Sequence, residues 1–460
     1  MGPIKFLWSF LATALLTLPH VVEAATDDCD GVLVSDALPV LINPALLLEH
    51  LQTLQGFADE NGGSRMAGTS GHNQTIQYIQ DELRSRGYYV EVQPFRGLMQ
   101  VRGQASLVVN GQSYNTEAVA WSPQFTALDI PVVPVGGSGC KETDYPDQIM
   151  GSVALVAGGE CSPSDKSKIA RQAGARALIL RESTELSASL GGIDDHHIPS
   201  IRISDRDARV MQKATISSLW ADLITEYGNE DNTLLVGTHT DSINSTAGIN
   251  DNASGIASLL EVASQLAKFQ TNSRVKFAFW TASEPCLLGS KHWFDVTRDE
   301  ELKKIKLYID VNMVGSSNGA LRVYDGNSTT FDQSGPHGSG DAEEVLAQGF
   351  RVQGVNATRA SITNRSDYAQ FYDHGIPFAG LFSGADGIKS KEEKAMFGGD
   401  ADQPYDIYYH KAEDDIENIN MTALMMNTKS LAHAVGIYGR SFEGFPSPLS
   451  APRYTPMDGV

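Results

Sequence analysis

Three separated segments of the chain carry side chains of the kinds that bind metal ions. His239 ends an apolar run, Asp251 closes a glycine-rich loop just before a helical pattern, and Glu284 follows a second apolar run. Imidazole nitrogen and carboxylate oxygen are the ligands that zinc takes in many catalytic sites. Because strand ends in an α/β sheet face one crevice, we expect these side chains to converge on one metal ion.

The elements that would position these residues can be read from apolar periodicity. Residues 233–236 and 275–280 have the pattern of buried strands, and residues 256–267 have the pattern of a helix. Residues 76–83 also recur at helical spacing, and residues 421–436 form a last helical pattern. This alternation of helix and strand predicts an α/β fold.

Seven sequence blocks occur in the order seen in secreted co-catalytic zinc aminopeptidases: GTHTDS, GINDNASG, FWTASE with LLGS, YIDVNMVGSSN, NRSDYAQF, GIPFAGLFSGA and YYHKAEDDIENIN. From about Leu47 to about Tyr438 the chain resembles the fungal leucine aminopeptidases that carry a protease-associated insert. The resemblance implies a three-layer α/β zinc-exopeptidase domain with a mixed, mainly parallel sheet, interrupted by a small protease-associated domain. It also implies a secreted zinc-dependent aminopeptidase that removes apolar N-terminal residues such as leucine from peptides.

The resemblance assigns five ligands to up to two zinc ions: the bridging Asp251, His239 and Asn312 at the first site, and Glu284 and His410 at the second. Asn312 stands where the family has an aspartate, and a neutral amide oxygen is a poorer zinc ligand than a carboxylate. Asp310, two residues earlier, could replace it only if the strand slipped, because such positions lie ~6.6 Å apart. We therefore expect the first site to be weakened and the second to be the more secure.

The resemblance also reveals that a catalytic group is missing. The family has two adjacent glutamates, the first a general base and the second a ligand, and here the pair is Ser283 and Glu284. A serine hydroxyl cannot act as a base near neutral pH, and loss of a general base typically costs ~10² to 10⁴ in rate. Zinc lowers the pKa of its bound water to about 7, which leaves room for residual hydrolysis. By resemblance, Tyr409 would help to stabilise the oxyanion and Asp241 would support His239.

Three functions stay open from the sequence, and whether the chain is an active enzyme is not decided. The first is an aminopeptidase whose activity is impaired by Ser283 and Asn312, and the second is a non-catalytic peptide-binding pseudopeptidase. The third is a single-zinc enzyme in the manner of glutaminyl cyclases, although those retain the acid/base glutamate that is absent here. Zinc stoichiometry separates them: two ions favour the aminopeptidase, one a cyclase-like site, and none a binding role.

Pattern changes along the chain predict five units: a signal peptide at 1–24, a first part of the peptidase domain at 25–103, a protease-associated insert at 104–223, the metal-site part of the peptidase domain at 224–440, and a disordered proline-rich tail at 441–460. In the insert, GSVALVAGGEC followed by KSKIARQAGARALIL resembles the core of a protease-associated domain. Cys140 and Cys161 match the disulfide pair of such domains, whereas Cys29 and Cys286 stay unassigned. The segment between Trp220 and Leu234 is shorter than in relatives, which leaves a shortened central sheet open.

The N-terminal pattern and the charge indicate where the protein acts. Lys5, an apolar run and a small-residue cleavage signature predict secretion, here favoured over a vacuolar location. The formal net charge of -21 argues against nucleic acid or an anionic membrane as partners. We predict a monomer that meets peptides as substrates or ligands. Six glycosylation sites are expected at Asn73, Asn244, Asn327, Asn356, Asn364 and Asn420.

Two further segments carry specific expectations. Asn252 also begins an Asn-x-Ser/Thr site, but we expect it to be unmodified because its neighbours in the ligand loop would be buried. The acidic run at residues 413–415, directly after His410, is interpreted as an exposed approach to a helix.

Overall fold

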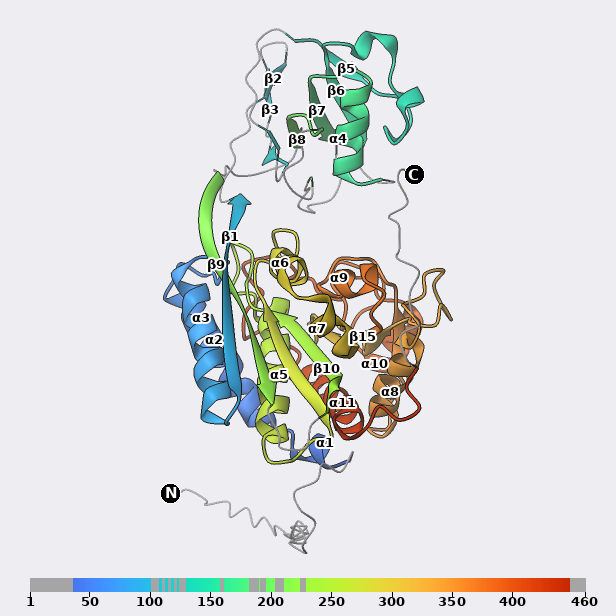
Figure 1. Cartoon of the computed structure of the whole chain (residues 1–460). Coiled ribbons are helices and arrows are strands. Elements are labelled where there is room, and N and C mark those ends of the chain that lie inside the picture. Colours follow the sequence, from blue (N-terminus) through green and yellow to red (C-terminus); the bar gives the residue numbers. More distant parts are fainter. Residues whose placement is uncertain are drawn as a thin grey trace, which may run out of the picture.

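An eight-stranded mixed sheet forms the centre of the molecule (Figure 1). The structure is a computed structural model that describes residues 36–100, 107–109, 112–114, 117–119, 122–123, 130–157, 161–181, 190, 196–202, 211–223 and 229–446. The strands, in spatial order, are β1 (Tyr89–Gln100), β9 (Met211–Leu223), β11 (Ser273–Trp280), β10 (Asn229–His239), β12 (Ile305–Val311), β15 (Phe378–Leu381), β13 (Arg322–Tyr324) and β14 (Thr358–Ala360). The pairs β11–β10, β10–β12 and β12–β15 are parallel, so the ends of these four strands meet at one edge.

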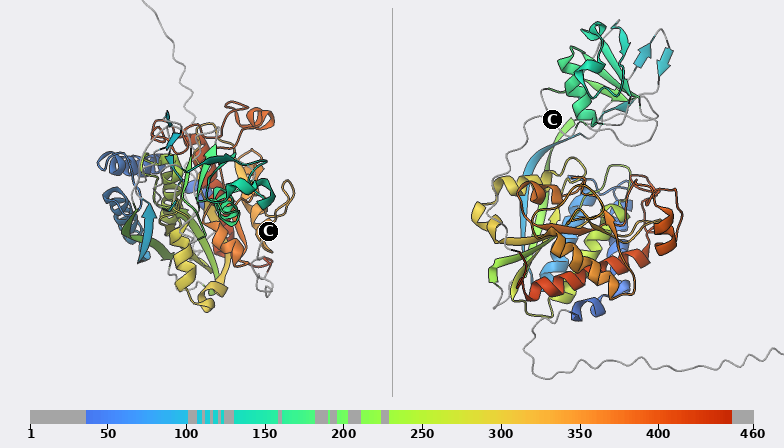
Figure 2. Two further views of the ribbon diagram at one scale, coloured as in Figure 1. Left: turned by 90° about the horizontal axis from the view of Figure 1, so that it is seen from above. Right: turned by 90° about the vertical axis from the view of Figure 1, so that its right-hand side faces the viewer.

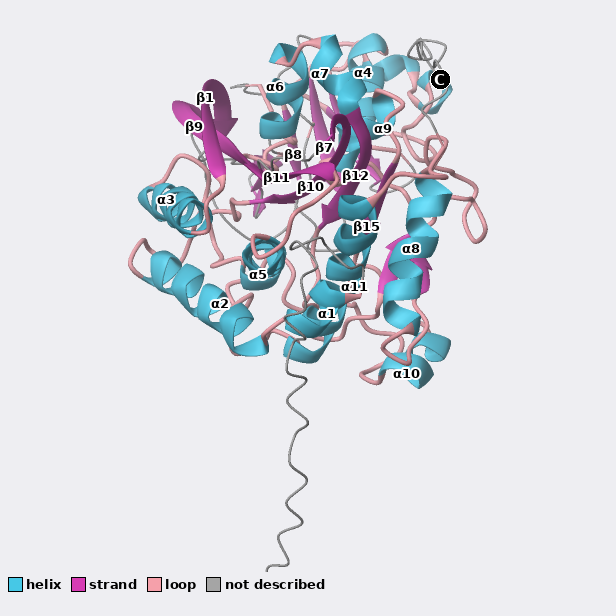
Figure 3. Ribbon diagram, turned by 60° about the horizontal axis from the view of Figure 1, so that its bottom comes forward, coloured by secondary structure: helices cyan, strands magenta, loops and turns pink. Residues whose placement is uncertain are grey.

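Helices cover both faces of this sheet and give the three layers that the sequence predicts (Figure 3). One face carries α1 (Ala37–Leu41), α2 (Pro44–Asp59), α3 (Ser70–Ser85), α5 (Ser254–Leu266), α8 (Ser339–Arg351) and α11 (Met421–Arg440). The other carries α6 (Leu288–Val296), α7 (Asp299–Lys304) and α9 (Tyr368–Asp373). The short helix α10 (Lys391–Phe397) belongs to the long segment between β15 and α11.

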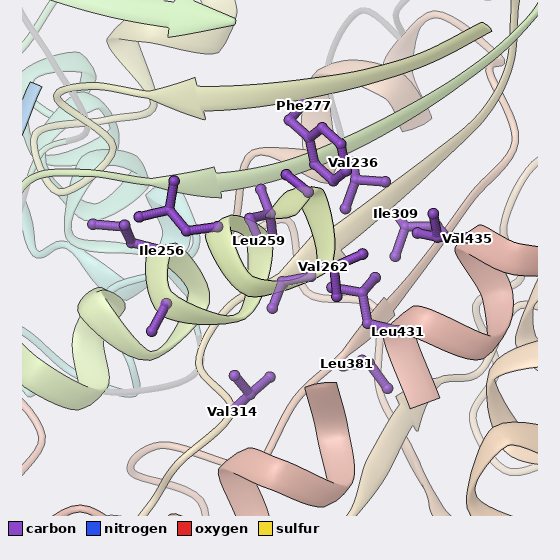
Figure 4. Close-up of a cluster of buried hydrophobic side chains, with 14 of the residues drawn as sticks. Val236, Ile256, Leu259, Val262, Phe277, Ile309, Val314, Leu381, Leu431 and Val435 are labelled. Atoms are coloured by element: carbon purple, nitrogen blue, oxygen red, sulfur yellow. The ribbon is translucent and has the colours of Figure 1, made fainter. Parts of the chain in front are cut away.

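The central strands are apolar on both faces because each face packs on helices. In β10, Leu234 and Val236 join the core under α5 and α11, while Leu235 joins the opposite cluster with Trp280 and Tyr308. This is the period of two expected of a strand, and it explains why the run reads as continuously apolar. Burial of each such side chain contributes roughly 1.5–3 kcal/mol. Figure 4 shows the larger core, with Val236, Phe277, Ile309, Leu259, Val262, Leu431 and Val435 among its members.

Helix α5 is buried on all its sides, as a helix in the centre of a large core is expected to be. Leu259 and Val262 pack towards the sheet. On the side of α11, the hydroxyl groups of Ser258 and Thr428 are hydrogen-bonded to each other at 2.8 Å. Because α5 is fixed on every side, the loop that precedes it, residues 248–253, is held at the edge of the sheet. That loop contains Asp251.

The insert forms a separate small sheet with its own core. Its strands are β5 (Val132–Pro134), β6 (Val153–Ala157), β7 (Ala177–Arg181), β8 (Ser200–Arg202) and β4 (Glu117–Ala118), with α4 (Pro163–Gln172) beside them and a hairpin of β2 (Leu107–Val109) and β3 (Gln112–Tyr114). The predicted strand–helix–strand unit is β6, α4 and β7. Cys140 and Cys161 form a disulfide, as the resemblance implies.

The insert is attached through a long antiparallel pair of strands. β1 and β9 are paired from Tyr89 with Asp222 to Gln100 with Met211, and the insert lies beyond their far ends (Figures 1 and 2). β9 falls inside the range 104–223 that the sequence assigns to the insert, yet it pairs with β1 and β11 of the large sheet. A strand therefore passes through Trp220, and the short segment after it joins two strands of the intact eight-stranded sheet.

Several expectations fall on residues outside the described part. These are the signal peptide at 1–24, Cys29 and the tail from residue 447 onward. Within the described residues, none of the helices combines the length and the apolar character that crossing a membrane requires.

Candidate metal centre

The predicted ligands gather where three neighbouring parallel strands end. His239 is the last residue of β10, Glu284 follows the end of β11 after three residues, and Asn312 directly follows β12. Asp251 comes from the loop before α5, and His410 from the segment before α11. The sheet edge thus brings together residues that lie up to 171 positions apart in sequence.

Asp251 lies between two histidines. Its Oδ1 is 3.2 Å from Nε2 of His239, and its Oδ2 is 3.3 Å from Nε2 of His410. Nε2 of His410 is also 3.3 Å from Oε2 of Glu284. Each carboxylate oxygen of Asp251 therefore faces a different histidine, which is the arrangement of a carboxylate that bridges two metal sites.

These residues fit zinc by their chemistry and by their unsatisfied atoms. The ligand atoms of His239, Asp251 and Glu284 all lie within 4.8 Å of one another. In the described structure, Oε1 of Glu284 and Nε2 of His410 are buried without a hydrogen-bond partner. Buried polar atoms are normally satisfied, so an orphaned nitrogen and an orphaned oxygen on neighbouring side chains indicate an ion site. Nitrogen and carboxylate oxygen are suitable zinc ligands.

Asp241 contacts both His239 and the loop that carries Glu284. Nδ1 of His239 lies 3.1 Å from the backbone oxygen of Asp241 and 3.7 Å from its Oδ1. The Asp241 carboxylate accepts the backbone N–H groups of Ser283 at 3.1 Å and Glu284 at 3.3 Å. It therefore ties the loop carrying Glu284 to the end of β10. Burial lowers the pKa of His239, but hydrogen bonds and charges from Asp241 and Asp251 outweigh it and raise the pKa above the ordinary range.

A buried arginine clamps the two loops that carry His239 and Asp251. The guanidinium of Arg65 donates to the backbone oxygens of Thr240 at 2.7 Å, Ala247 at 3.0 Å and Gly248 at 2.8 Å. The side chain is fully buried, and this burial lowers its pKa to about 10. Arg65 was not among the residues identified from sequence. It lies 174 positions before His239 and belongs to none of the seven sequence blocks.

One residue of the acidic run after His410, Asp414, holds the loop that carries Asp251. Asp414 is 2% exposed, and its carboxylate accepts the backbone N–H groups of Asn250 at 2.6 Å and Asp251 at 3.1 Å. Burial, together with the nearby Asp251 charge, raises the pKa of Asp414 to about 8. The interpretation of residues 413–415 as an exposed approach is therefore wrong for Asp414. Charge runs are solvated on average, and only the fold shows that one member turns inward.

Ser283 is engaged by a buried carboxylate. Its Oγ donates to Oδ2 of Asp367 at 2.9 Å, and Ser290 Oγ donates to Oδ1 of the same residue at 2.5 Å. Burial raises the pKa of Asp367 to about 6. At the position where the resemblance predicts a general base, the chain thus presents a hydroxyl that donates to a buried carboxylate.

Asn312 and Asp310 take different directions from the end of β12. Asp310 accepts hydrogen bonds from Tyr308 OH at 2.9 Å and from Ser366 Oγ at 2.7 Å, and burial together with the Asp367 charge raises its pKa to about 7. Asn312 Nδ2 donates to Ser366 Oγ at 3.1 Å, and Asn312 lines a cavity that Asp251 also lines. Asp310 therefore points into this hydrogen-bond network and not towards the candidate metal centre. The strand has not slipped in the way that would make Asp310 a ligand.

A cavity of about 330 Å³ opens beside the metal centre. Tyr409 lines it, and its ring stacks on His410 with the ring centroids 3.9 Å apart. The hydroxyl of Tyr409 lies 3.5 Å from Nη2 of Arg365, which also lines the cavity. The lining also includes the apolar or aromatic Met313, Tyr324, Phe331, Phe382 and Tyr405, and the polar or charged Arg322, Ser361, Thr363, Ser366 and Asp386.

The predicted glycosylation sites differ in exposure. Asn252 is fully buried, and its side chain donates to Thr238 Oγ1 at 2.7 Å and to the backbone oxygen of Val311 at 2.9 Å. Asn420 is half-buried and caps α11, while the exposed sites are Asn73, Asn244, Asn327, Asn356 and Asn364. The burial of Asn252 agrees with the expectation that it is unmodified.

Comparisons with known proteins place these features in a family context. The model of peptidase family M28 matches residues 222–435, and that of the PA domain matches residues 128–211. Leucine aminopeptidase 2 of Trichophyton rubrum is 33% identical over 439 residues, covering 90% of this chain and 89% of the relative. Leucine aminopeptidase 2 of Arthroderma otae is 34% identical over 471 residues, covering 95% and 94%.

Solved structures share the fold. An aminopeptidase from Aneurinibacillus sp. strain AM-1 is similar with a TM-score of 0.72 and 23% identity, covering 91% of this chain and 98% of that one. The zinc aminopeptidase BSAP from Bacillus subtilis is similar with a TM-score of 0.67 and 21% identity, covering 88% and 97%.

Proposed function

Because the chain belongs to peptidase family M28, we propose that it is a secreted, zinc-dependent aminopeptidase whose turnover is slowed by Ser283 and Asn312. The observation that carries this proposal is the position of Asp251, with one carboxylate oxygen towards His239 and the other towards His410. Secretion is supported by the N-terminal pattern of the sequence.

The ligand set supports two sites of unequal strength. Asp251, Glu284 and His410 would hold one zinc ion with a full set of charged and imidazole ligands. His239 and Asp251 would hold the other, with only the amide of Asn312 in place of a carboxylate. When bound, zinc supplies a Lewis acid and lowers the pKa of water, which is the chemistry that peptide hydrolysis requires.

The side chains around the centre have separate roles in this proposal. The cavity beside the centre receives the side chain of the first substrate residue, and the apolar side chains of Met313, Phe331 and Phe382 in its wall support bulky residues such as leucine. In this proposal, Tyr409 donates its hydroxyl hydrogen to a developing oxyanion. Ser283 cannot take a proton from water at neutral pH, so the step that needs a base is slow.

One observation favours a second candidate, a non-catalytic peptide-binding protein. The Ser283 hydroxyl already donates to Asp367, so the position of the family's base is occupied by a hydrogen-bonded pair that does not offer a free carboxylate at the centre. Such a protein would retain the cavity and bind peptide N-termini without cleaving them. A single-zinc, cyclase-like enzyme is disfavoured because it also needs the missing glutamate.

Zinc analysis and hydrolysis of leucine p-nitroanilide by the purified secreted protein test the proposal together. We expect bound zinc, slow hydrolysis and loss of hydrolysis when a chelator removes the metal. Zinc without any hydrolysis, even after Ser283 and Asn312 are replaced by Glu and Asp, would support the binding protein instead. Light scattering would check the expected monomer.

A further inference from the structure

A half-buried arginine and several aromatic side chains form one part of the cavity wall. Arg322 of β13 lines this cavity together with Tyr324, Phe382 and Tyr405, and Asp251 and Asn312 line its end at the metal centre. The guanidinium carbon lies 4.7 Å from the ring centroid of Tyr405 and 5.7 Å from that of Phe382. These rings hold the guanidinium by cation–π contact and fix its position.

The hydrogen-bonding capacity of Arg322 is largely unused. Within the described residues, its Nη2 donates to the backbone oxygen of Arg359 at 3.1 Å, and its Nε is buried without a hydrogen-bond partner. An arginine carries five N–H donors, and buried donors are normally satisfied. The side chain is 12% exposed. Nε faces Glu393, so the terminal Nη groups are the donors that remain for a ligand in the cavity.

The neighbouring carboxylate does not use these donors. Oε1 of Glu393 is 3.7 Å from Nε of Arg322, which is beyond hydrogen-bonding distance. Glu393 accepts instead from Tyr405 OH at 2.5 Å, Thr358 Oγ1 at 2.9 Å and the backbone N–H of Ser390 at 3.2 Å. Glu393 thus lies beside Nε of Arg322 and balances the charge of the guanidinium, and no hydrogen bond joins it to the Nη groups within the described residues.

The other guanidinium of the cavity is in a different situation. Arg365 is 54% exposed, and its Nη1 donates to Asp386 at 2.9 Å and 3.3 Å. It is therefore paired with a carboxylate at a solvent-exposed position. Arg365 provides a matched comparison, because it lines the same cavity and carries the same charge.

Because of these donors, we expect the cavity to prefer a substrate side chain that ends in a hydrogen-bond acceptor. A leucine side chain that displaces water from this cavity would leave the Arg322 donors unsatisfied, whereas a side chain with a terminal oxygen would replace the lost hydrogen bonds. The methylene groups of such a side chain would still pack on Phe331 and Phe382. An unpaired buried donor is costly, so this difference discriminates between substrates.

We propose that Arg322 selects substrates whose first residue ends in an acceptor oxygen, glutamate or glutamine, in preference to leucine. This inference rests on the proposed function, because it places the first side chain of a peptide in the cavity beside the metal centre. It extends the apolar preference: the walls accept the stem of the side chain, and Arg322 binds its end.

The test compares kcat/KM for glutamate, glutamine and leucine p-nitroanilides, together with calorimetric binding of free L-glutamate, L-glutamine and L-leucine. The proteins are the wild type, Arg322→Met and the matched control Arg365→Met. We expect the wild type to prefer glutamate or glutamine over leucine by about tenfold or more, the size of one charge-assisted hydrogen bond. Arg322→Met should reverse this order, and Arg365→Met should keep it.

The outcomes distinguish this inference from the proposed function. Leucine preferred by the wild type, or equal losses for all three substrates in Arg322→Met, would overturn the role of Arg322 while leaving the aminopeptidase intact. If no anilide is cleaved, the proposed function fails, and calorimetry still decides the selectivity of the cavity. Because the wild-type order alone can refute the proposal, a variant that does not fold leaves it testable.

Discussion

Ser283 and Asp367 are joined by a hydrogen bond in which the serine Oγ donates to Oδ2 of the aspartate at 2.9 Å. Both residues are buried, and Asp367 also accepts from Ser290. At the position where the resemblance predicts a base, the chain has a hydroxyl, and the nearby carboxylate belongs to Asp367, which accepts the hydrogen of that hydroxyl. We expect the rate of the proposed reaction to depend on Ser283.

Replacing Ser283 by Glu together with Asn312 by Asp should raise kcat for leucine p-nitroanilide by ~10² to 10⁴, because it restores the base and a charged ligand. Ser283→Gln with Asn312→Asp is the matched control, since it has the same shape without a base. Asp367 would then face a second carboxylate, so we expect the new glutamate to have a raised pKa. A wild-type rate within about tenfold of the revertant would show that base loss does not limit this protein.

Zinc content should report the difference between the two sites. We expect the wild type to retain about one zinc ion per chain after dialysis, and Asn312→Asp to retain about two, because a carboxylate binds zinc better than an amide. Asp251→Asn should lose both ions, since each oxygen of Asp251 faces one site. Metal analysis by mass spectrometry measures this directly. Two tightly held ions in the wild type would contradict the weakening by Asn312.

Acid should destabilise the protein partly through His50. This residue is 7% exposed, and burial together with the charge of Arg86 lowers its pKa from 6.5 to about 4. A lowered histidine pKa means that the unfolded chain binds the proton first, so the stabilisation is present above pH 6.5 and is lost as pH falls from 6.5 to 4. The full effect is about 3 kcal/mol.

Urea unfolding between pH 7 and pH 4 measures this effect. His50→Gln should unfold with a shallower pH dependence than the wild type, by about 1 kcal/mol per pH unit in the steep region. His337→Gln, a change at an exposed histidine, serves as the matched control. Parallel curves for the wild type and His50→Gln would contradict the assignment of this proton to His50.

Cys286 should strain the loop that follows Glu284. Its φ is +83°, in the left-handed region that favours glycine, and Leu287 follows with φ +55°. Cys286→Gly should therefore be more stable than Cys286→Ala by about 1 kcal/mol, because both remove the thiol and only glycine relieves the backbone. Thermal unfolding of the two variants measures the difference. Equal stabilities would show that the loop is not strained at this residue.

The sequence predicted the elements whose pattern is local. The strands at 233–236 and 275–280 and the helix after Asp251 are present because continuous apolar runs bury both faces of a strand or all sides of a helix. The convergence of His239, Asp251 and Glu284 followed from the rule that parallel strands end at one edge. His410 was identified only through the resemblance, because it follows no strand.

The residues that hold the loops of the candidate metal centre in place could not be predicted from local sequence patterns. Arg65 and Asp414 act through backbone groups of loops that are distant in sequence, and neither lies in a pattern that distinguishes it from a surface charge. Asp367 lies in a sequence block that the resemblance used, yet its role depends on Ser283, 84 positions earlier. Such pairings are set by tertiary packing and are visible only once the fold is known.

The paired strands β1 and β9 determine how the insert relates to the rest of the chain. Gln100 and Met211 are partners in this ladder, so the chain leaves and re-enters the peptidase domain at adjacent points. In topological terms, the whole insert occupies the place of a hairpin turn. The same geometry makes the junction a natural point for exchanging one module for another.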